Sequence, residues 1–193
     1  MITAPHTRLP YLPGSGQPVG LVTVDHQWNA VTVPALWGRL VWDVLAERSG
    51  PVLEDTAAGH LMWVIPPGSA DRWPDATAAG VHVHEAGAEL LVCGQDGHRC
   101  GMRWLRVPTT QQNETDAREL RTALEWILGP LTEAEPVQVC ISCGAPTRHG
   151  HLIARQPSSA GPDKEVHACP GCWREISCGG VGRHLRVVRK GPL

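Results

Sequence analysis

The chain lacks several features that would point directly to a function. Its 193 residues contain no Phe, one Tyr and only two Lys among 17 basic residues, a bias that indicates a GC-rich genome rather than an activity. No apolar run approaches the roughly 20 residues that cross a bilayer, so no membrane span is expected. The first residues show no basic stretch followed by an apolar run, which indicates no secretory signal and favours a cytoplasmic protein.

Motifs of familiar enzyme classes are missing as well. The sequence has no nucleophile elbow, no HExxH helix and no phosphate-binding glycine loop after a strand, since Gly14-x-Gly16 lies in a proline-rich leader. It therefore gives no positive indication of catalysis. A non-enzymatic protein is favoured, with enzymatic activity left open.

Two cysteine pairs, Cys140-Ile-Ser-Cys143 and Cys169-Pro-Gly-Cys172, are the strongest chemical signal present, and 25 residues separate them. Two CxxC pairs are the usual ligand set of a tetrahedral zinc site, so the four thiols predict one bound Zn²⁺ in a zinc ribbon over residues 137–193. Four cysteines leave no open coordination position, which makes this zinc structural. A redox dithiol or two disulfides are the alternatives.

Residues 1–19, rich in Pro and Gly, predict a flexible leader, and residues 20–130 predict an α+β domain of mostly antiparallel sheet with two helices. Alternating or apolar runs indicate strands at 20–25, 29–33, 51–53, 60–65, 81–84, 89–93 and 102–107. Pro34 opens the first helix, whose apolar stripe is Leu36, Leu40, Val41, Val44 and Leu45. Asn113 caps the second, which Gly129-Pro130 ends. Residues 133–136 form the linker.

Charge divides at this linker. Residues 1–136 carry a net charge of −7 and residues 137–193 a net charge of +5. Zinc and four thiolates lower the tail to about +3. A basic tail suggests contact with DNA, RNA or the acidic body. The candidate nucleic-acid contacts are one aromatic residue that could stack on a base and five basic residues: Trp173, Arg174, Arg183, Arg186, Arg189 and Lys190. A solvated basic terminus with Trp173 packed in a small core is the alternative.

Six further side chains pose the question of a second metal site. His82 and His84 would point to one face of a strand, and His60, Cys93, His98 and Cys100 could join them, although the spacing matches no standard ligand pattern. Ordinary buried thiols beside a hairpin turn are favoured. Cys178, His184, His149, His151 and His167 are expected to be bystanders of the four-cysteine site.

Four segments carry a resemblance: Asn29-Ala30-Val31-Thr32-Val33-Pro34, Gly50-Pro51-Val52-Leu53-Glu54-Asp55, Trp63-Val64-Ile65-Pro66-Pro67-Gly68-Ser69-Ala70 and Arg103-Trp104-Leu105-Arg106-Val107-Pro108. They resemble small actinobacterial proteins similar to part of the N-terminal domain of bifunctional primase-polymerases, enzymes of plasmids and prophages. The tail, with Cys140-Ile-Ser-Cys143-Gly144 and Val166-His167-Ala168-Cys169-Pro170, resembles zinc-ribbon modules of the same organisms. Together these segments span about residues 20 to 175.

Such polymerases hold two divalent ions on closely spaced acidic residues. This chain has no DxD pair on a predicted strand, and Asp25-His26 and His82-Val83-His84-Glu85 are the nearest substitutes. The resemblance therefore implies a degenerate domain retained for binding or scaffolding, and no catalytic residue is assigned. Three hypotheses follow: a zinc protein that binds nucleic acid or a replication or transcription partner, a divergent primase-polymerase or nucleotidyl transferase, and a protein-interaction adaptor.

Overall fold

The computed structural model describes residues 9–13, 17–94, 101–133, 135–157 and 164–177. The chain divides into two compact units, Met1–Glu135, which we call the body, and Pro136–Leu193, the C-terminal unit. No helix among the described residues is long and apolar enough to cross a membrane.

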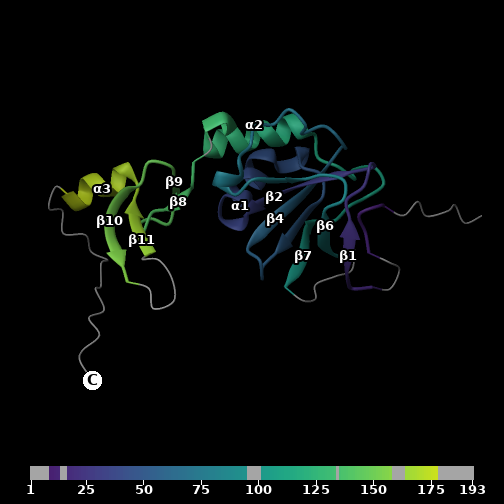
Figure 1. Ribbon diagram of the computed structural model, residues 1–193, viewed down its shortest axis with the longest axis horizontal. Helices are drawn as coiled ribbons and strands as arrows, with labels where there is room; N and C mark the ends of the chain where they lie inside the picture. The colour runs from purple at the N-terminus through teal and green to yellow at the C-terminus, as the bar shows by residue number, and fades with distance from the viewer. Residues whose placement is uncertain (1–8, 14–16, 95–100, 134, 158–163, 178–193) are drawn as a thin grey trace, which may run out of the picture. The chain divides into compact units, whose positions relative to one another are not determined.

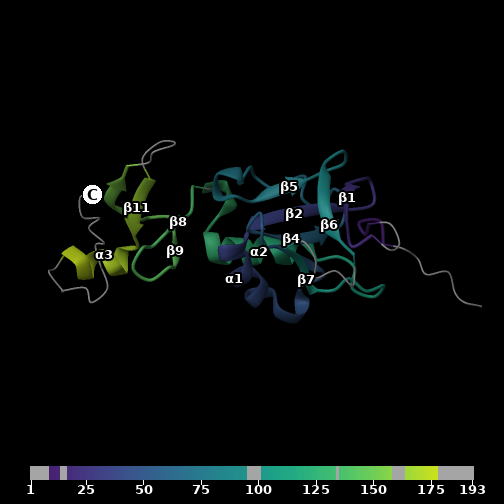
Figure 2. The same ribbon diagram turned by 90° about the horizontal axis from the view of Figure 1, so that it is seen from below.

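The body is built on a five-stranded antiparallel sheet in the order β5-β2-β4-β3-β7 (Figure 1). Its strands are β2 (Asn29–Pro34), β3 (Val52–Asp55), β4 (His60–Ile65), β5 (His82–His84) and β7 (Met102–Arg106). A second antiparallel pair, β1 (Val19–Thr23) and β6 (Glu89–Cys93), lies beside it (Figure 2). All seven predicted strands form, each within two residues of its predicted bounds, and the predicted α+β class with antiparallel sheets is confirmed.

Helix α1 (Ala35–Leu45) packs on β2, β4 and α2 (Ala117–Leu128). It buries Trp37, Val41 and Leu45, whereas Leu36 and Leu40 of the predicted stripe are 42% and 38% exposed. The reason lies at Gly38, where a Cβ would stand 3.3 Å from the Leu61 Cβ. Because Gly38 is buried and leaves almost no room for a side chain next to Leu61 of β4, the face that contains Gly38 meets the sheet.

The cap of helix α2 lies three residues beyond the predicted cap, Asn113. The Asp116 carboxylate accepts hydrogen bonds from the backbone N–H groups of Arg118 and Glu119, at 2.8 and 3.1 Å. Thr115 just before it is held by β4 and by Gly50: its N–H donates to Val64 O and its hydroxyl oxygen accepts from the Gly50 N–H. Because Thr115 bonds to β4 and to Gly50, the chain enters the helix only after it, and Asp116 rather than Asn113 is the cap.

The face of the sheet opposite α1 packs against β1 and β6. Part of the predicted flexible leader belongs to this core: Leu9 and Tyr11 are buried, and the Tyr11 hydroxyl donates to the Asn113 carbonyl at 2.7 Å. The Tyr11 ring also lies 5.6 Å from that of Trp28. The flexible-leader prediction is therefore wrong for residues 9–13, because two large apolar side chains among the prolines gain more from burial than the chain loses in freedom.

The C-terminal unit contains two antiparallel pairs, β8 (Gln138–Val139) with β9 (Pro146–Thr147) and β10 (His151–Gln156) with β11 (Lys164–Ala168). Helix α3 (Pro170–Ser177) follows; no helix was predicted here. A single bridge between Cys140 and His167 joins the two pairs. Among its described residues only Cys140 and Ala168 are buried, so the unit has almost no apolar core.

Candidate metal centre

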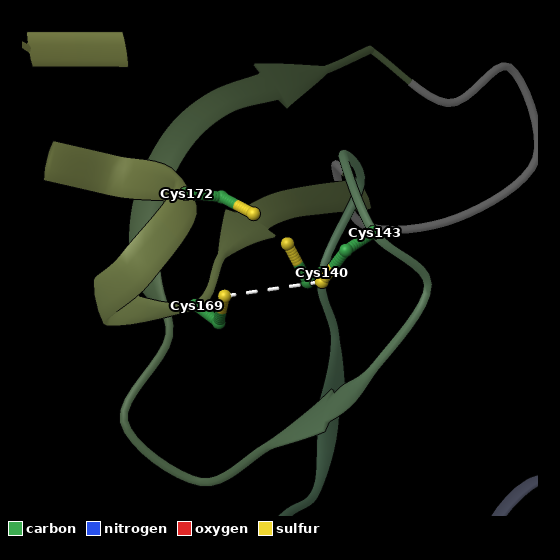
Figure 3. A group of neighbouring side chains, drawn as sticks. All are labelled: Cys140, Cys143, Cys169 and Cys172. Atoms are coloured by element: carbon green, nitrogen blue, oxygen red, sulfur yellow. Dashed lines mark hydrogen bonds between the residues drawn. The ribbon is translucent and has the colours of Figure 1, made fainter. Parts of the chain in front are cut away.

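Four cysteines from two loops converge in the C-terminal unit (Figure 3). Cys140 and Cys143 lie in the turn between β8 and β9, Cys169 directly follows β11, and Cys172 lies in the first turn of α3. Their four sulfur atoms all lie within 4.8 Å of one another, and Cys143 Sγ is 3.9 Å from Cys169 Sγ. Thiolates at about 2.3 Å from a tetrahedral zinc ion are about 3.8 Å apart, so the arrangement fits such an ion.

Local backbone geometry explains why both thiols of each pair face inward. In the first loop the Gly144 N–H donates to Cys140 O at 2.8 Å, and the Cys140 N–H donates to Ala145 O at 2.9 Å. Gly144 has a φ of 71°, which glycine adopts without strain. In the second loop, Pro170 begins α3 and the Trp173 N–H donates to Cys169 O, which brings Cys172 back beside Cys169.

The thiols influence one another's acidity. Burial raises the pKa of Cys140, but hydrogen bonds from the backbone of Cys169, Cys143 and Ser142 outweigh it and lower the pKa to about 6. Side-chain hydrogen bonds with Cys169 and Cys143, together with burial, raise the pKa of Cys172 to about 12. One thiolate thus forms readily and the last proton is held tightly. A divalent cation is the group that would let all four ionise together, with release of the remaining protons.

The described members of the suspected second site do not form a comparable cluster. His82 and His84 have ring centroids 6.5 Å apart, and His84 Nε2 is 2.8 Å from the Thr32 hydroxyl oxygen. Cys93 is fully buried in the core against β1 and β7, where burial raises its pKa to about 11. Across the described ranges, the only group of metal-ligating side chains that meets is that of the four cysteines. His98 and Cys100 lie outside the described residues.

The histidines of the C-terminal unit take other roles. The His167 Nε2 atom lies 3.4 Å from a carboxylate oxygen of Glu165. The His151 ring stacks on that of Trp173, with centroids 5.3 Å apart and planes at 17°. The sequence predicts His151 to be a bystander of the four-cysteine site, and its contact with Trp173 could not be predicted because the two residues lie on separate elements, β10 and α3.

The predicted nucleic-acid contacts are placed only in part. Trp173 is half-buried in α3, and Arg174 beside it is exposed, with its Nε donating to Pro170 O at 3.3 Å. The remaining basic candidates, Arg183, Arg186, Arg189 and Lys190, lie outside the described residues, as do Cys178 and His184. The described surface therefore offers one stacked aromatic pair with one adjacent arginine.

The polymerase hypothesis predicts two carboxylates from neighbouring strands, within about 4 to 6 Å of each other in a pocket of the body. Glu54 is the one buried carboxylate among the described residues, and its two oxygens accept hydrogen bonds from Arg39 and Arg103. Both oxygens are occupied, so Glu54 is not free to bind a divalent ion. No protein family, curated protein or solved structure matches the chain.

Proposed function

We propose that the C-terminal unit is a zinc ribbon with one structural Zn²⁺ held by Cys140, Cys143, Cys169 and Cys172. The observation that carries this proposal is the convergence of four sulfur atoms within 4.8 Å of one another, with Cys143 Sγ and Cys169 Sγ 3.9 Å apart, close to the separation of two thiolates on a tetrahedral zinc ion. Four thiolates fill the coordination sphere, so the ion stabilises the fold and performs no catalysis.

The small core supports the same conclusion from energetics. With Cys140 and Ala168 as the buried residues of the described part of this unit, apolar burial offsets little of the entropy lost on ordering the chain. Zinc binding contributes roughly 10–16 kcal/mol in comparable small domains, which suffices to fold such a unit. The metal therefore takes the place of a hydrophobic core.

Metal content tests this assignment. We expect one zinc per wild-type chain by elemental analysis and less than one tenth of that in Cys169→Ser, because three thiolates with a serine hydroxyl bind zinc far more weakly. Cys93→Ala is the control, since this thiol lies in the body core, and it should retain one zinc. Two zinc ions in the wild type would contradict the single-site assignment.

We further propose that the ribbon binds single-stranded DNA or RNA in the cytoplasm. The stacked Trp173–His151 pair supports this, since aromatic faces on a small zinc module stack on nucleobases. Arg174 and the basic residues 183–190 supply positive charge for the phosphates. The body, in this proposal, is a degenerate primase-polymerase-like domain that serves binding or scaffolding.

Anisotropy titrations of the full chain with a labelled oligonucleotide at two salt concentrations test this step. Stacking contributes about 1–3 kcal/mol per base, so Trp173→Ala should weaken binding roughly 5- to 100-fold. Trp126→Ala removes a 79% exposed tryptophan from the body and is the matched control, with no change expected. If the zinc-loaded chain binds no oligonucleotide at low salt, the nucleic-acid role is wrong.

Exposed apolar side chains favour a second candidate, the docking of a replication or transcription protein. Val139, Ile141 and Leu152 of the C-terminal unit are 47%, 53% and 43% exposed. Burial of such residues would give binding that persists in high salt, in contrast to phosphate contacts. The effect of salt on binding by the C-terminal unit therefore distinguishes nucleic-acid binding from protein docking.

A further inference from the structure

A buried carboxylate on β3, the strand next to the edge strand β7, holds two arginines. Glu54 on β3 is 1% exposed, and its Oε2 accepts a hydrogen bond from Arg103 Nε at 2.6 Å. Its Oε1 accepts from a terminal nitrogen of Arg39, which comes from α1. The arginine side chains are 56% (Arg39) and 50% (Arg103) exposed. One fixed anion thus holds two guanidinium groups that both reach solvent.

The charges of this cluster do not cancel. Burial raises the pKa of Glu54, but the side-chain hydrogen bonds of Arg103 and Arg39 outweigh that effect, so its pKa lies below the usual carboxyl value and the group is ionised at neutral pH. Two arginines and one carboxylate leave a net charge of +1. Arg103 uses its Nε in the contact with Glu54, which leaves its terminal fork of N–H donors available for another acceptor.

One member of the cluster, Arg103, also lines a cavity. Arg103 lines an open cavity of about 440 Å³ together with Thr56, Gly101 and Met102. The Thr56 hydroxyl donates to Gly101 O at 2.7 Å, so its hydrogen is engaged there. Among the described lining residues Arg103 alone carries a charge, and the volume of the cavity lies in the range of small-molecule sites.

Stability alone gives a weak reason for this arrangement. Burying a carboxylate costs desolvation energy, and buried ion pairs are often replaced by apolar residues without loss of stability. What the carboxylate adds is geometry, because it fixes two flexible side chains at one place. The surrounding body has a net charge of −7, so two arginines held here form a local exception.

We propose that Arg103 and Arg39 form an anion site on the body that binds a terminal phosphate of a small phosphorylated molecule, with Glu54 as the positioning residue. Planar guanidinium forks match phosphate oxygens in a bidentate manner, and a dianionic terminal phosphate gains more from two arginines than a monoanionic phosphodiester does. The site belongs to the body and does not depend on the function proposed for the zinc ribbon.

The test is a titration of the zinc-loaded full chain with inorganic pyrophosphate at constant ionic strength, followed by NMR of the arginine Nε–Hε groups. We expect saturable shifts at Arg39 and Arg103. A dinucleotide with one phosphodiester is the second arm and should bind at least tenfold more weakly. Equal binding of both probes would mean that the site recognises nucleic-acid backbone and would overturn the proposal for a terminal phosphate.

Substitutions that keep the charge test the role of the forks. Arg39→Lys and Arg103→Lys retain an ion pair with Glu54 but lose bidentate geometry, so each should weaken pyrophosphate binding about tenfold. Arg72→Lys changes an exposed arginine of the body and is the matched control, with no effect expected. The proposal is wrong if pyrophosphate causes no saturable shifts of the arginine Nε–Hε signals, or if Arg72→Lys weakens pyrophosphate binding as much as the two test variants do.

Glu54→Gln separates positioning from charge. Removal of a negative charge beside two arginines should tighten anion binding if only charge matters. A positioning residue predicts the opposite, because a neutral amide offers one acceptor oxygen to two guanidinium groups, and binding should weaken at least threefold. Tighter binding by a folded Glu54→Gln chain contradicts the positioning role, and the two lysine variants carry the test if this variant does not fold.

Discussion

Single residues decide the electrostatics of this protein at two places. In the C-terminal unit, backbone hydrogen bonds lower the pKa of Cys140 to about 6, whereas side-chain hydrogen bonds with Cys169 and Cys143 raise that of Cys172 to about 12. In the body, Glu54 is ionised among apolar neighbours because two arginines bind it. In both places a group of like charges is held together by a central opposite charge: Glu54 between two arginines, and in our proposal zinc among four thiolates.

The Glu54 pKa makes the body's stability depend on pH. Because the pKa in the folded chain lies below the usual value of 4.5, stability from this group is present above pH 4.5 and is lost as the pH falls through the folded value. Glu54→Gln should lower the free energy of unfolding by roughly 1–3 kcal/mol at pH 7. It should also flatten the stability loss below pH 4.5, as measured by urea unfolding between pH 3 and 7.

The control for this measurement is Glu47→Gln, whose carboxylate is 97% exposed and pairs with Arg106. An exposed ion pair contributes little to stability, so the free energy of unfolding of Glu47→Gln should match that of the wild type both at pH 7 and below pH 4.5. If the free energy of unfolding of Glu54→Gln falls as steeply below pH 4.5 as that of the wild type, other carboxyl groups cause the acid destabilisation.

Sequence reasoning found one of these two centres and missed the other. The cysteines could be predicted because each CxxC pair is local and its spacing has a known purpose. Glu54 gives no such signal: its partners Arg39 and Arg103 lie 15 and 49 residues away, and only the pairing of β3 with β7 and the packing of α1 bring them together.

Among the elements, the strands could be predicted from the sequence more accurately than the start of α2 or the buried face of α1. An alternating or continuous apolar run is a property of the strand segment alone, and such runs predicted all seven body strands. The buried face of α1 depends on Gly38 approaching Leu61, and the start of α2 depends on contacts of Thr115 with β4 and Gly50. These contacts join segments that are distant along the chain, so the periodicity of one segment cannot predict them.

The start of α2 gives an element-level prediction. Asp116→Ala removes two hydrogen bonds to the first turn and should destabilise the body by about 1 kcal/mol, seen as a fall of a few degrees in its melting temperature. Asn113→Ala is the matched control, because the Asn113 contact with Tyr11 uses its backbone carbonyl. A larger loss in Asn113→Ala than in Asp116→Ala would restore Asn113 as the cap.

At the scale of the whole molecule, the two units rely on different sources of stability. The body has a large apolar core, with Trp28, Trp63 and Tyr11 among its fully buried side chains. The C-terminal unit, in its described part, buries only Cys140 and Ala168. The opposite net charges of the two parts already indicate this division in the sequence. The distribution of large apolar residues agrees with it, since Trp173 is the only one of eight tryptophans beyond residue 136.

This contrast predicts separate responses to metal removal. If zinc supplies most of the folding free energy of the C-terminal unit, as we propose, addition of a strong chelator should unfold this unit and leave the body folded. Amide hydrogen exchange measured by peptide should then show lost protection in β10, β11 and α3, with unchanged protection in β2, β3 and β4. Re-addition of zinc should restore the exchange pattern, whereas magnesium, which prefers oxygen ligands, should not. Equal loss of protection in both units would mean that the body also depends on the metal, and full protection of β10 and β11 without zinc would mean that the ribbon is stabilised by something other than its four thiolates.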